Sequence, residues 1–223
     1  MPTQVQFRRG SQSANSNYTG AAGEITINQD YGTIHVHDGS VAGGNVLVAR
    51  DSVQTLTNKT LATTSISGNL IPTANLTYNL GSASAWFNNS YTVSSQAKYA
   101  DLAEKYSPDA DYKEGTVVVF GGDKEVTITT KDHDPAVAGV VSTKPAYLMN
   151  ADTTGVAVAM TGRVPCRVQG PVAKGDAVVT SNTPGVARQI DNSKFVPGCI
   201  IGKSLETITT TDIVTIEVVV GKH

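Results

Sequence analysis

Apolar and polar residues alternate over short stretches of this chain, and glycine, asparagine or aspartate separates one stretch from the next. In residues 23–40, GEITINQDYGTIHVHDGS, two alternating halves flank a turn. The second half sets Ile34 and Val36 on one face and His35 and His37 on the other. This pattern predicts a β-hairpin, and the Asp-Gly pair after His37 marks its end. Further strands are expected at residues 4–8 and 45–50.

The second half of the chain, from residue 109 onward, is also rich in short apolar runs. Stretches such as GTVVVF, KEVTITT, AVAGVVS, DAVVTS and DIVTIEVVV are bounded by Gly, Pro, Asp or Asn. Short strands with turn signals between them are typical of a β-barrel or sandwich. The run from Val117 to Phe120 is continuously apolar, which predicts a strand that is buried on both faces.

One stretch has a helical period instead. Residues 94–107 include SQAKYADLAEKY, which is rich in good helix formers. Tyr99, Leu102, Ala103 and Tyr106 recur at helical spacing and form one apolar stripe. Because a proline follows directly, we predict a short helix that ends there. Its stripe is expected to dock either on a threefold axis or on the domain that follows.

The composition favours strands. Only 39% of the 223 residues are hydrophobic and 16% are charged, while Gly, Thr, Ser and Asn are abundant. Val and Thr fit a pleated surface, and Gly and Asn supply turns, so the expected fold class is all-β. The low apolar share indicates that a lone monomer would bury little core and would gain from oligomerisation.

The charge and hydropathy of the chain exclude two classes of partner. The net charge is −2, and the Arg8-Arg9 pair is too short to form the basic stripe of a nucleic-acid-binding protein. No run approaches the ~20 apolar residues of a membrane-spanning helix. The first residues lack the apolar segment of a secretory signal, so we expect assembly in a cytoplasm.

The N-terminal residues resemble a known viral module. The FRRG opening, the hairpin sequence of residues 23–40 and the GGNVLVAR that follows are similar to the N-terminal module of phage tropism-determinant and tail-fibre proteins. The resemblance covers about residues 4–50. It implies a small trimer-forming β-fold that attaches the chain to a virus particle.

The connecting region, residues 51–93, resembles segments of phage fibres. The LTNKTL of residues 56–61 is similar to a connector repeat in which three chains wind together. The NLTYNLGSASAWFNNSYT of residues 75–92 resembles an element that precedes a C-terminal fibre domain. An ordinary loop held by an aromatic cluster is the alternative interpretation of the same residues. The candidate trimer or packing residues of this region and the helix are Trp86, Phe87, Tyr91, Tyr99, Leu102 and Tyr106.

The C-terminal sequence resembles the last domain of many tail-fibre and virion structural proteins, particularly those of cyanobacterial phages. Phrases such as KYADLAEKYSPDADYKEGTVVVFGG, GRVPCRV and GPVAKGDAVVTSNTPGVAR carry the resemblance over residues 97–206. It implies a β-barrel or sandwich knob over residues 108–223. The whole chain is thus expected to be an intertwined homotrimer of two small β domains (the first over residues 1–50), joined by a slender connector and a short helix.

Two pairs of residues raise the question of metal or redox chemistry. His35 and His37 point the same way on a strand, so three chains around an axis could surround one octahedral ion such as iron. A polar strand face in water explains the two histidines equally well. Cys166 and Cys199 are the two cysteines, and buried thiols are favoured over a disulfide or a metal site because neither has a closely spaced partner cysteine.

No constellation typical of an enzyme is visible. His133 lies in KDHDPA, which reads as a solvated polar turn, and no Gly-x-Ser-x-Gly elbow occurs. A distant similarity to self-cleaving chaperone domains of phage appendages would place a cut near Ser94 and Ser95. We expect no catalysis.

The function predicted from these patterns is that of a homotrimeric phage virion fibre that contributes to host attachment, through a surface glycan or protein. A head fibre, capsid decoration or baseplate protein without receptor binding is one alternative. A self-cleaving domain that assists trimer assembly is another. In each case the partners are further copies of the chain and other virion proteins.

Overall fold

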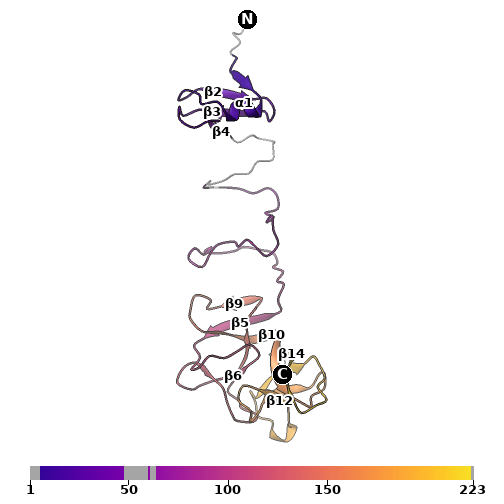
Figure 1. The fold of residues 1–223 in the computed structure, drawn as a ribbon. Coiled ribbons are helices and arrows are strands. Elements are labelled where there is room, and N and C mark those ends of the chain that lie inside the picture. The colour runs from indigo at the N-terminus through magenta and orange to yellow at the C-terminus, as the bar shows by residue number, and fades with distance from the viewer. Residues whose placement is uncertain (1–5, 48–59, 61–63, 222–223) are drawn as a thin grey trace. The chain divides into compact units, whose positions relative to one another are not determined.

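A computed structural model describes residues 6–47, 60 and 64–221 of the chain (Figure 1). The chain divides into two compact units, residues 1–77 and residues 78–223. The predicted connector motif at residues 56–61 lies almost wholly outside the described residues. Within these described residues the regular structure is made of strands apart from one short α-helix and one 3-10 turn, so the predicted all-β fold class is confirmed.

The first unit is a four-stranded sheet with a short helix. Its strands are β1 (Arg8–Gly10), β2 (Ile25–Asn28), β3 (Thr33–Val36) and β4 (Asn45–Val46), hydrogen-bonded in the order β1-β2-β3-β4. Helix α1 (Gln12–Ser16) begins after Ser11, whose side chain accepts a hydrogen bond from the backbone of Ala14. Strands β2 and β3 form the predicted hairpin.

The polar face of this hairpin is the buried one, and its aliphatic face is more exposed. Thr26, Asn28, Thr33 and His35 lie on the buried face. The other face carries the aliphatic residues, and Ile34 on it is 42% exposed. Alternation therefore identified the two faces correctly, but the polar face is the one covered by the rest of the unit.

The second unit contains ten strands in one sheet. They are β5 (Asp101–Tyr106), β6 (Val117–Phe120), β7 (Val126–Thr127), β8 (Val137–Ser142), β9 (Tyr147–Met149), β10 (Val156–Gln169), β11 (Ala177–Thr180), β12 (Ala187–Gln189), β13 (Ile200–Ser204) and β14 (Ile213–Val220). The 3-10 turn η1 (Asn192–Lys194) follows β12.

Part of this sheet closes on itself. Strand β10 pairs antiparallel with β14, β14 with β13, β13 with β11, β11 with β12, and β12 pairs in parallel with the end of β10. The result is a small closed barrel, one of the two architectures predicted for this region. The first half of β10 instead pairs with β5 and β8, and β6, β7 and β9 extend that side of the sheet.

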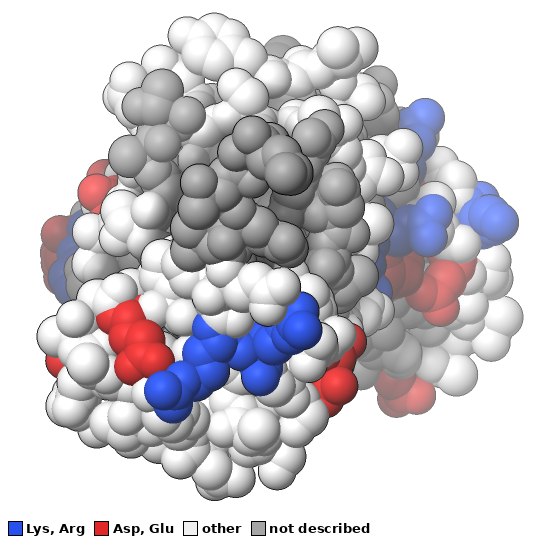
Figure 2. Space-filling view, turned by 90° about the horizontal axis from the view of Figure 1, so that it is seen from above, with Lys and Arg blue, Asp and Glu red and all other residues white. Residues whose placement is uncertain are grey.

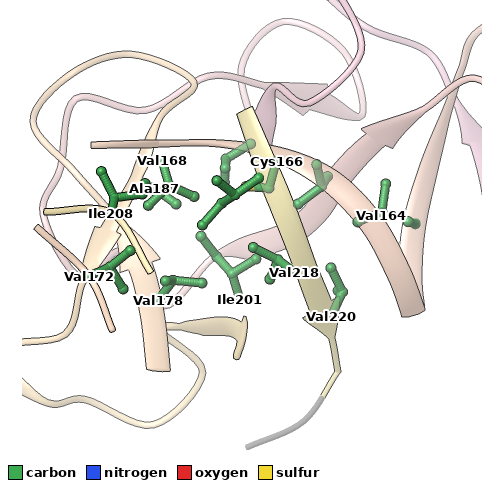
Figure 3. Packing of buried hydrophobic residues seen from close by; sticks show 14 residues of the cluster. Val164, Cys166, Val168, Val172, Val178, Ala187, Ile201, Ile208, Val218 and Val220 are labelled. Carbon is green, nitrogen blue, oxygen red and sulfur yellow. The ribbon is translucent and has the colours of Figure 1, made fainter. Parts of the chain in front are cut away.

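Short aliphatic residues fill the barrel. Val164, Cys166 and Val168 of β10 pack with Ile201 of β13 and Val218 of β14, as Figure 3 shows. Burial raises the pKa of the Cys166 thiol to about 12. Cys199 is also buried and unpaired, so the prediction of two buried free thiols is confirmed. The valines of β6 are buried on both faces as predicted, whereas Phe120 is exposed.

The predicted helix over residues 94–107 is wrong. Residues 101–106 form strand β5, and the residues before them form no helix. Strand β5 pairs with β10 on one side and with β9 on the other, burying Asp101 and Ala103. The helix preference of Ala, Leu, Lys and Glu amounts to less than about 0.7 kcal/mol per residue, so pairing on both edges outweighs it.

Replacement of the barrel's central isoleucine should destabilise the second unit. Ile201 is 1% exposed, so Ile201→Ala removes buried methyl groups and leaves a cavity, at a cost of about 2–5 kcal/mol. Ile213→Ala is the matched control, because Ile213 on the same barrel is 45% exposed. Urea unfolding followed by circular dichroism measures both. Equal losses in the two variants would contradict the described core.

Candidate functional site

The two histidines predicted as metal ligands are buried in the first unit. His35 and His37 are 3% and 2% exposed. His35 donates from Nδ1 to the carbonyl of Gly43 at 2.6 Å, and its Nε2 forms a hydrogen bond with Thr33 Oγ1 at 3.1 Å. His37 accepts at Nδ1 from the backbone of Gly20 at 3.1 Å, so its Nε2 donates to Thr26 Oγ1 at 3.0 Å. Each imidazole thus ties a loop to the sheet through both of its ring nitrogens.

This arrangement bears on the iron hypothesis. All four ring nitrogens of His35 and His37 have partners within the same chain. Among the described residues, no group of three or more His, Cys, Asp or Glu side chains is placed to hold a metal ion. An ion shared by several chains would have to displace some of these hydrogen bonds. Iron binding stays a prediction, while the geometry gives the two histidines a structural role.

A network of charged and aromatic groups surrounds His37. Tyr18 packs edge-on against its ring at 5.3 Å between centroids, and the Arg8 guanidinium lies 4.3 Å above the Tyr18 ring. The Tyr18 hydroxyl donates to the Glu24 carboxylate, which also pairs with Arg8 Nε at 3.2 Å. The hydrogen bond from Tyr18 lowers the pKa of Glu24 and raises that of Tyr18. Arg8, Tyr18 and Glu24 thus support one another beside the buried histidine.

The same region is hollowed. A cavity of about 170 Å³ is lined by Arg8, Arg9, Asn15, Tyr18 and Thr26, among others. Figure 2 shows both basic and acidic side chains, among many uncharged residues, on the face that it presents. In the first unit the Arg8 charge is balanced by the neighbouring Glu24 carboxylate.

The six predicted trimer or packing residues are not brought together in the single chain. Trp86, Phe87 and Tyr91 are strongly exposed, Tyr91 at 92%. Tyr99 is exposed, and the half-buried Tyr106 packs edge-on against Phe120 with ring centroids 5.5 Å apart. Burial, with the Glu104 hydrogen bond, raises the pKa of Tyr106 to about 12. The aromatic residues before β5 therefore have little cover from their own chain.

His133 is buried, which the sequence analysis did not predict. It is 3% exposed, whereas its polar turn was expected to be solvated. Its Nε2 accepts from the backbone of Asp191 at 3.0 Å, and its Nδ1 lies 3.1 Å from Asp132 Oδ1. Arg188 and Lys194 also pair with Asp132. The turn was predicted correctly, but its packing against β12 and η1 depends on contacts that are remote in sequence.

The described residues thus form a modular all-β protein whose first unit is held by polar contacts. Residues 5–41 match the family model for the major tropism determinant N-terminal domain. A stretch of 55 residues, 25% of the chain, is 49% identical to the tail fiber receptor-binding protein of Bordetella phage BPP-1. That stretch spans 14% of the length of this relative.

Solved structures of the same group were also found. The U1 and P3c variants of the major tropism determinant are 17% and 18% identical to the chain, each with a TM-score of 0.21. Each similarity covers 95% of this chain and 42% of the other. The predicted resemblance of the N-terminal residues to a tropism-determinant-like phage tail fibre is confirmed by the family model and the relative. The resemblance of the C-terminal residues to cyanobacterial phage fibres stays a prediction.

Within the residues that the structure describes, no helix has both the length and the apolar character needed to cross a membrane.

Loss of His37 should destabilise the first unit. His37→Ala leaves the backbone N–H of Gly20 and the hydroxyl of Thr26 without their partners, at a cost of about 2–3 kcal/mol. Thermal unfolding, compared with the exposed-site variant Gln29→Ala, measures the loss. Iron at one ion per three wild-type chains that disappears in His37→Ala would instead support the metal hypothesis.

The first unit should also lose stability in acid. The pKa of Glu24 is held below its ordinary value of 4.5, chiefly by the Tyr18 hydroxyl. A depressed carboxyl pKa contributes stability above its unfolded value, and that contribution is lost as the pH falls through the folded value. Glu24→Gln should therefore flatten the acid limb of the unit's unfolding curve. An unchanged acid limb, measured by NMR of the module's amides, would contradict this role.

Proposed function

We propose that this chain is a homotrimeric virion fibre protein of a bacteriophage, attached to the particle and contributing to adhesion to the host surface. The observation that carries the fibre assignment is the match of residues 5–41 to the tropism-determinant N-terminal domain. The relative with 49% identity is described as a tail fibre receptor-binding protein, which supports the adhesive part of the proposal.

The open face of the first unit's sheet supports assembly with further copies. Ile27 and Ile34 are cross-strand neighbours on this face, and the backbone of Leu47 pairs with that of Ile34. Ile34 and Leu47 are 42% and 50% exposed. Covering the aliphatic side of a sheet that is open to water is favourable, because it removes apolar surface from water.

The second support is the segment of residues 64–99. Large apolar side chains follow one another along it with little cover from their own chain. They are Ile66, Leu70, Ile71, Leu76, Tyr78, Leu80, Trp86, Phe87, Tyr91, Val93 and Tyr99. The local contacts are short-range, such as the two backbone hydrogen bonds between Ser82 and Ala85. Soluble proteins rarely leave such a series exposed, so the segment is suited to burial between chains.

Identical copies are the simplest cover for both surfaces. Cyclic symmetry places the same segment of each chain around one axis, so each copy covers its neighbour with the same side chains. In this proposal the sheet of the first unit and residues 64–99 form the trimer contacts, and the strands of the second unit, β5 to β14, form the exposed knob. A head fibre, decoration or baseplate protein would share the trimer but would bind only virion proteins. The proposal includes no catalytic step.

The mass of the purified chain tests this assembly. Light scattering should give about 70 kDa, three times the chain mass of 23.3 kDa, with intact chains by mass spectrometry. Ile34→Lys places a charge on the open aliphatic face and should shift the population toward monomers. Chains cut near Ser94 would instead favour the self-cleaving alternative.

A second substitution serves as the control for this experiment. Val41→Lys adds the same charge at a loop residue that is 55% exposed, and it should leave the trimer intact. A wild-type mass of 23.3 kDa, or equal dissociation in both variants, would contradict the proposed trimer.

A further inference from the structure

The seam at which the barrel closes carries a groove. Two depressions of about 270 and 360 Å³ lie there, and Pro171 and Gln189 line both of them. We call these two neighbouring depressions together the seam groove. Gln169 and Arg188 line one half, where the end of β10 pairs with β12. Ile208 belongs to the lining of the other half. The volumes approach the roughly 300–1,000 Å³ of small-molecule sites.

The walls of the seam groove are held firmly. Val172 and Ile208 exchange two backbone hydrogen bonds, of 3.0 and 2.8 Å. A Cβ on Gly170 would lie 2.3 Å from the carbonyl oxygen of Thr210, so this position accepts only glycine. The loop at residues 170–172 and the loop at residues 208–210 therefore pack backbone against backbone at Gly170. A site with a fixed shape loses little conformational entropy when a ligand binds.

The polar side chains of the groove are oriented before any ligand binds. Asp176 Oδ2 accepts hydrogen bonds from the backbone of Ala173 at 2.8 Å and from Gln189 Nε2 at 2.7 Å. This fixes the Gln189 amide and directs its Oε1 away from Asp176. Arg188 is anchored by its Nε, which donates to the backbone carbonyl of Gln189. Carboxylate, amide and guanidinium groups thus retain hydrogen-bonding capacity at neighbouring positions.

The charges of the groove are balanced. Arg188 pairs with Asp132 at 3.4 Å, and Asp176 supplies a negative charge in the other half. A phosphate or sulfate ligand would meet the Asp176 carboxylate, and a cation would meet Arg188. The second half also presents aliphatic surface from Pro171 and Ala173. An uncharged ligand with many hydroxyl groups and apolar C–H faces fits this combination.

We propose that the seam groove binds a neutral oligosaccharide of the host cell surface, with Asp176 and Gln189 accepting hydrogen bonds from sugar hydroxyls and Arg188 donating to them. This inference rests on the proposed adhesive function and names the class of receptor that the second unit would recognise. Planar groups with two hydrogen-bonding atoms match adjacent hydroxyls on a sugar ring. The aliphatic wall covers the ring's C–H face.

Saturation-transfer NMR on the full chain tests the ligand class. The probes are the methyl glycosides of glucose, galactose, mannose and N-acetylglucosamine, and the polysaccharide released from the host envelope. Binding with millimolar dissociation constants is expected for at least one probe. Asp176→Asn keeps the acceptor for Ala173 and Gln189 but replaces the remaining carboxylate oxygen with a donor, so binding should weaken at least tenfold. Absence of transfer to every probe would overturn the proposal.

Matched variants separate the groove from the rest of the surface. Asp152→Asn makes the same change at an exposed turn, and Gln29→Ala is the control for Gln189→Ala. Both controls should bind as wild type does, with all five proteins showing the same unfolding temperature within a few degrees. Equal binding by Asp176→Asn and Asp152→Asn would overturn the assignment of the groove.

Adhesion to host cells is measured separately with fluorescently labelled chain. If wild type binds cells and both groove variants bind equally well, the groove proposal fails while adhesion stands. If wild type binds a glycoside but not cells, sugar binding by the groove stands, while the adhesive function and the host-surface source of the sugar fail. Loss of both glycoside and cell binding in Asp176→Asn and Gln189→Ala, with the controls unaffected, supports the two together.

Discussion

The pairing of strand β10 is the interaction on which the second unit depends. Its later residues pair with β14 and β12 and thereby close the barrel, while its earlier residues pair with β5 and β8. A register shift between Ala159 and Thr161 lies just before the point where the two parts meet, at Gly162, which pairs with both β5 and β14. A bulge of this kind bends a strand and increases its twist. One strand of 14 residues can therefore belong to a closed barrel and to an open sheet. The seam groove exists because this strand meets β12 in parallel at its last two residues.

The first unit is organised in a different way, since polar contacts fill its interior. A buried polar group is costly unless its hydrogen bonds are satisfied, and His35 and His37 satisfy theirs at both ring nitrogens. Such a network fixes the positions of the loops around Gly20 and Gly43. It also leaves the aliphatic face of the hairpin for contacts outside the unit. Burial of the polar face of the hairpin thus has two consequences. It supplies the hydrogen bonds that hold the first unit together, and it leaves the aliphatic face on the surface.

Local patterns in the sequence were sufficient to predict the hairpin, the all-β class, the barrel as one of two architectures and the buried thiols. They failed where tertiary pairing decided the outcome. The helix expected over residues 94–107 is wrong, because residues 101–106 form strand β5, which is paired at both edges. The burial of His133 depends on Asp191, which is 58 residues away in the sequence. The face of the hairpin that is covered depends on α1 and on the loops, neither of which alternation describes. For the seam groove no local signal exists, because its residues come from segments that are far apart in the sequence, near residues 169–176, 188–189 and 207–209.

Two kinds of open surface remain on the chain, and their chemistry separates their roles. The hairpin face at Ile34 and the segment of residues 64–99 are apolar, and an apolar surface gains from burial without requiring a particular geometry. The seam groove has oriented hydrogen-bonding groups and balanced charges, which stay well hydrated when no ligand is present. In the proposed function, covering the first kind stabilises an assembly, whereas filling the second discriminates among ligands. These two proposed roles fall on different residues of the chain. Substitutions that alter ligand choice at Gln189 or Asp176 would therefore leave the proposed contacts between chains unchanged.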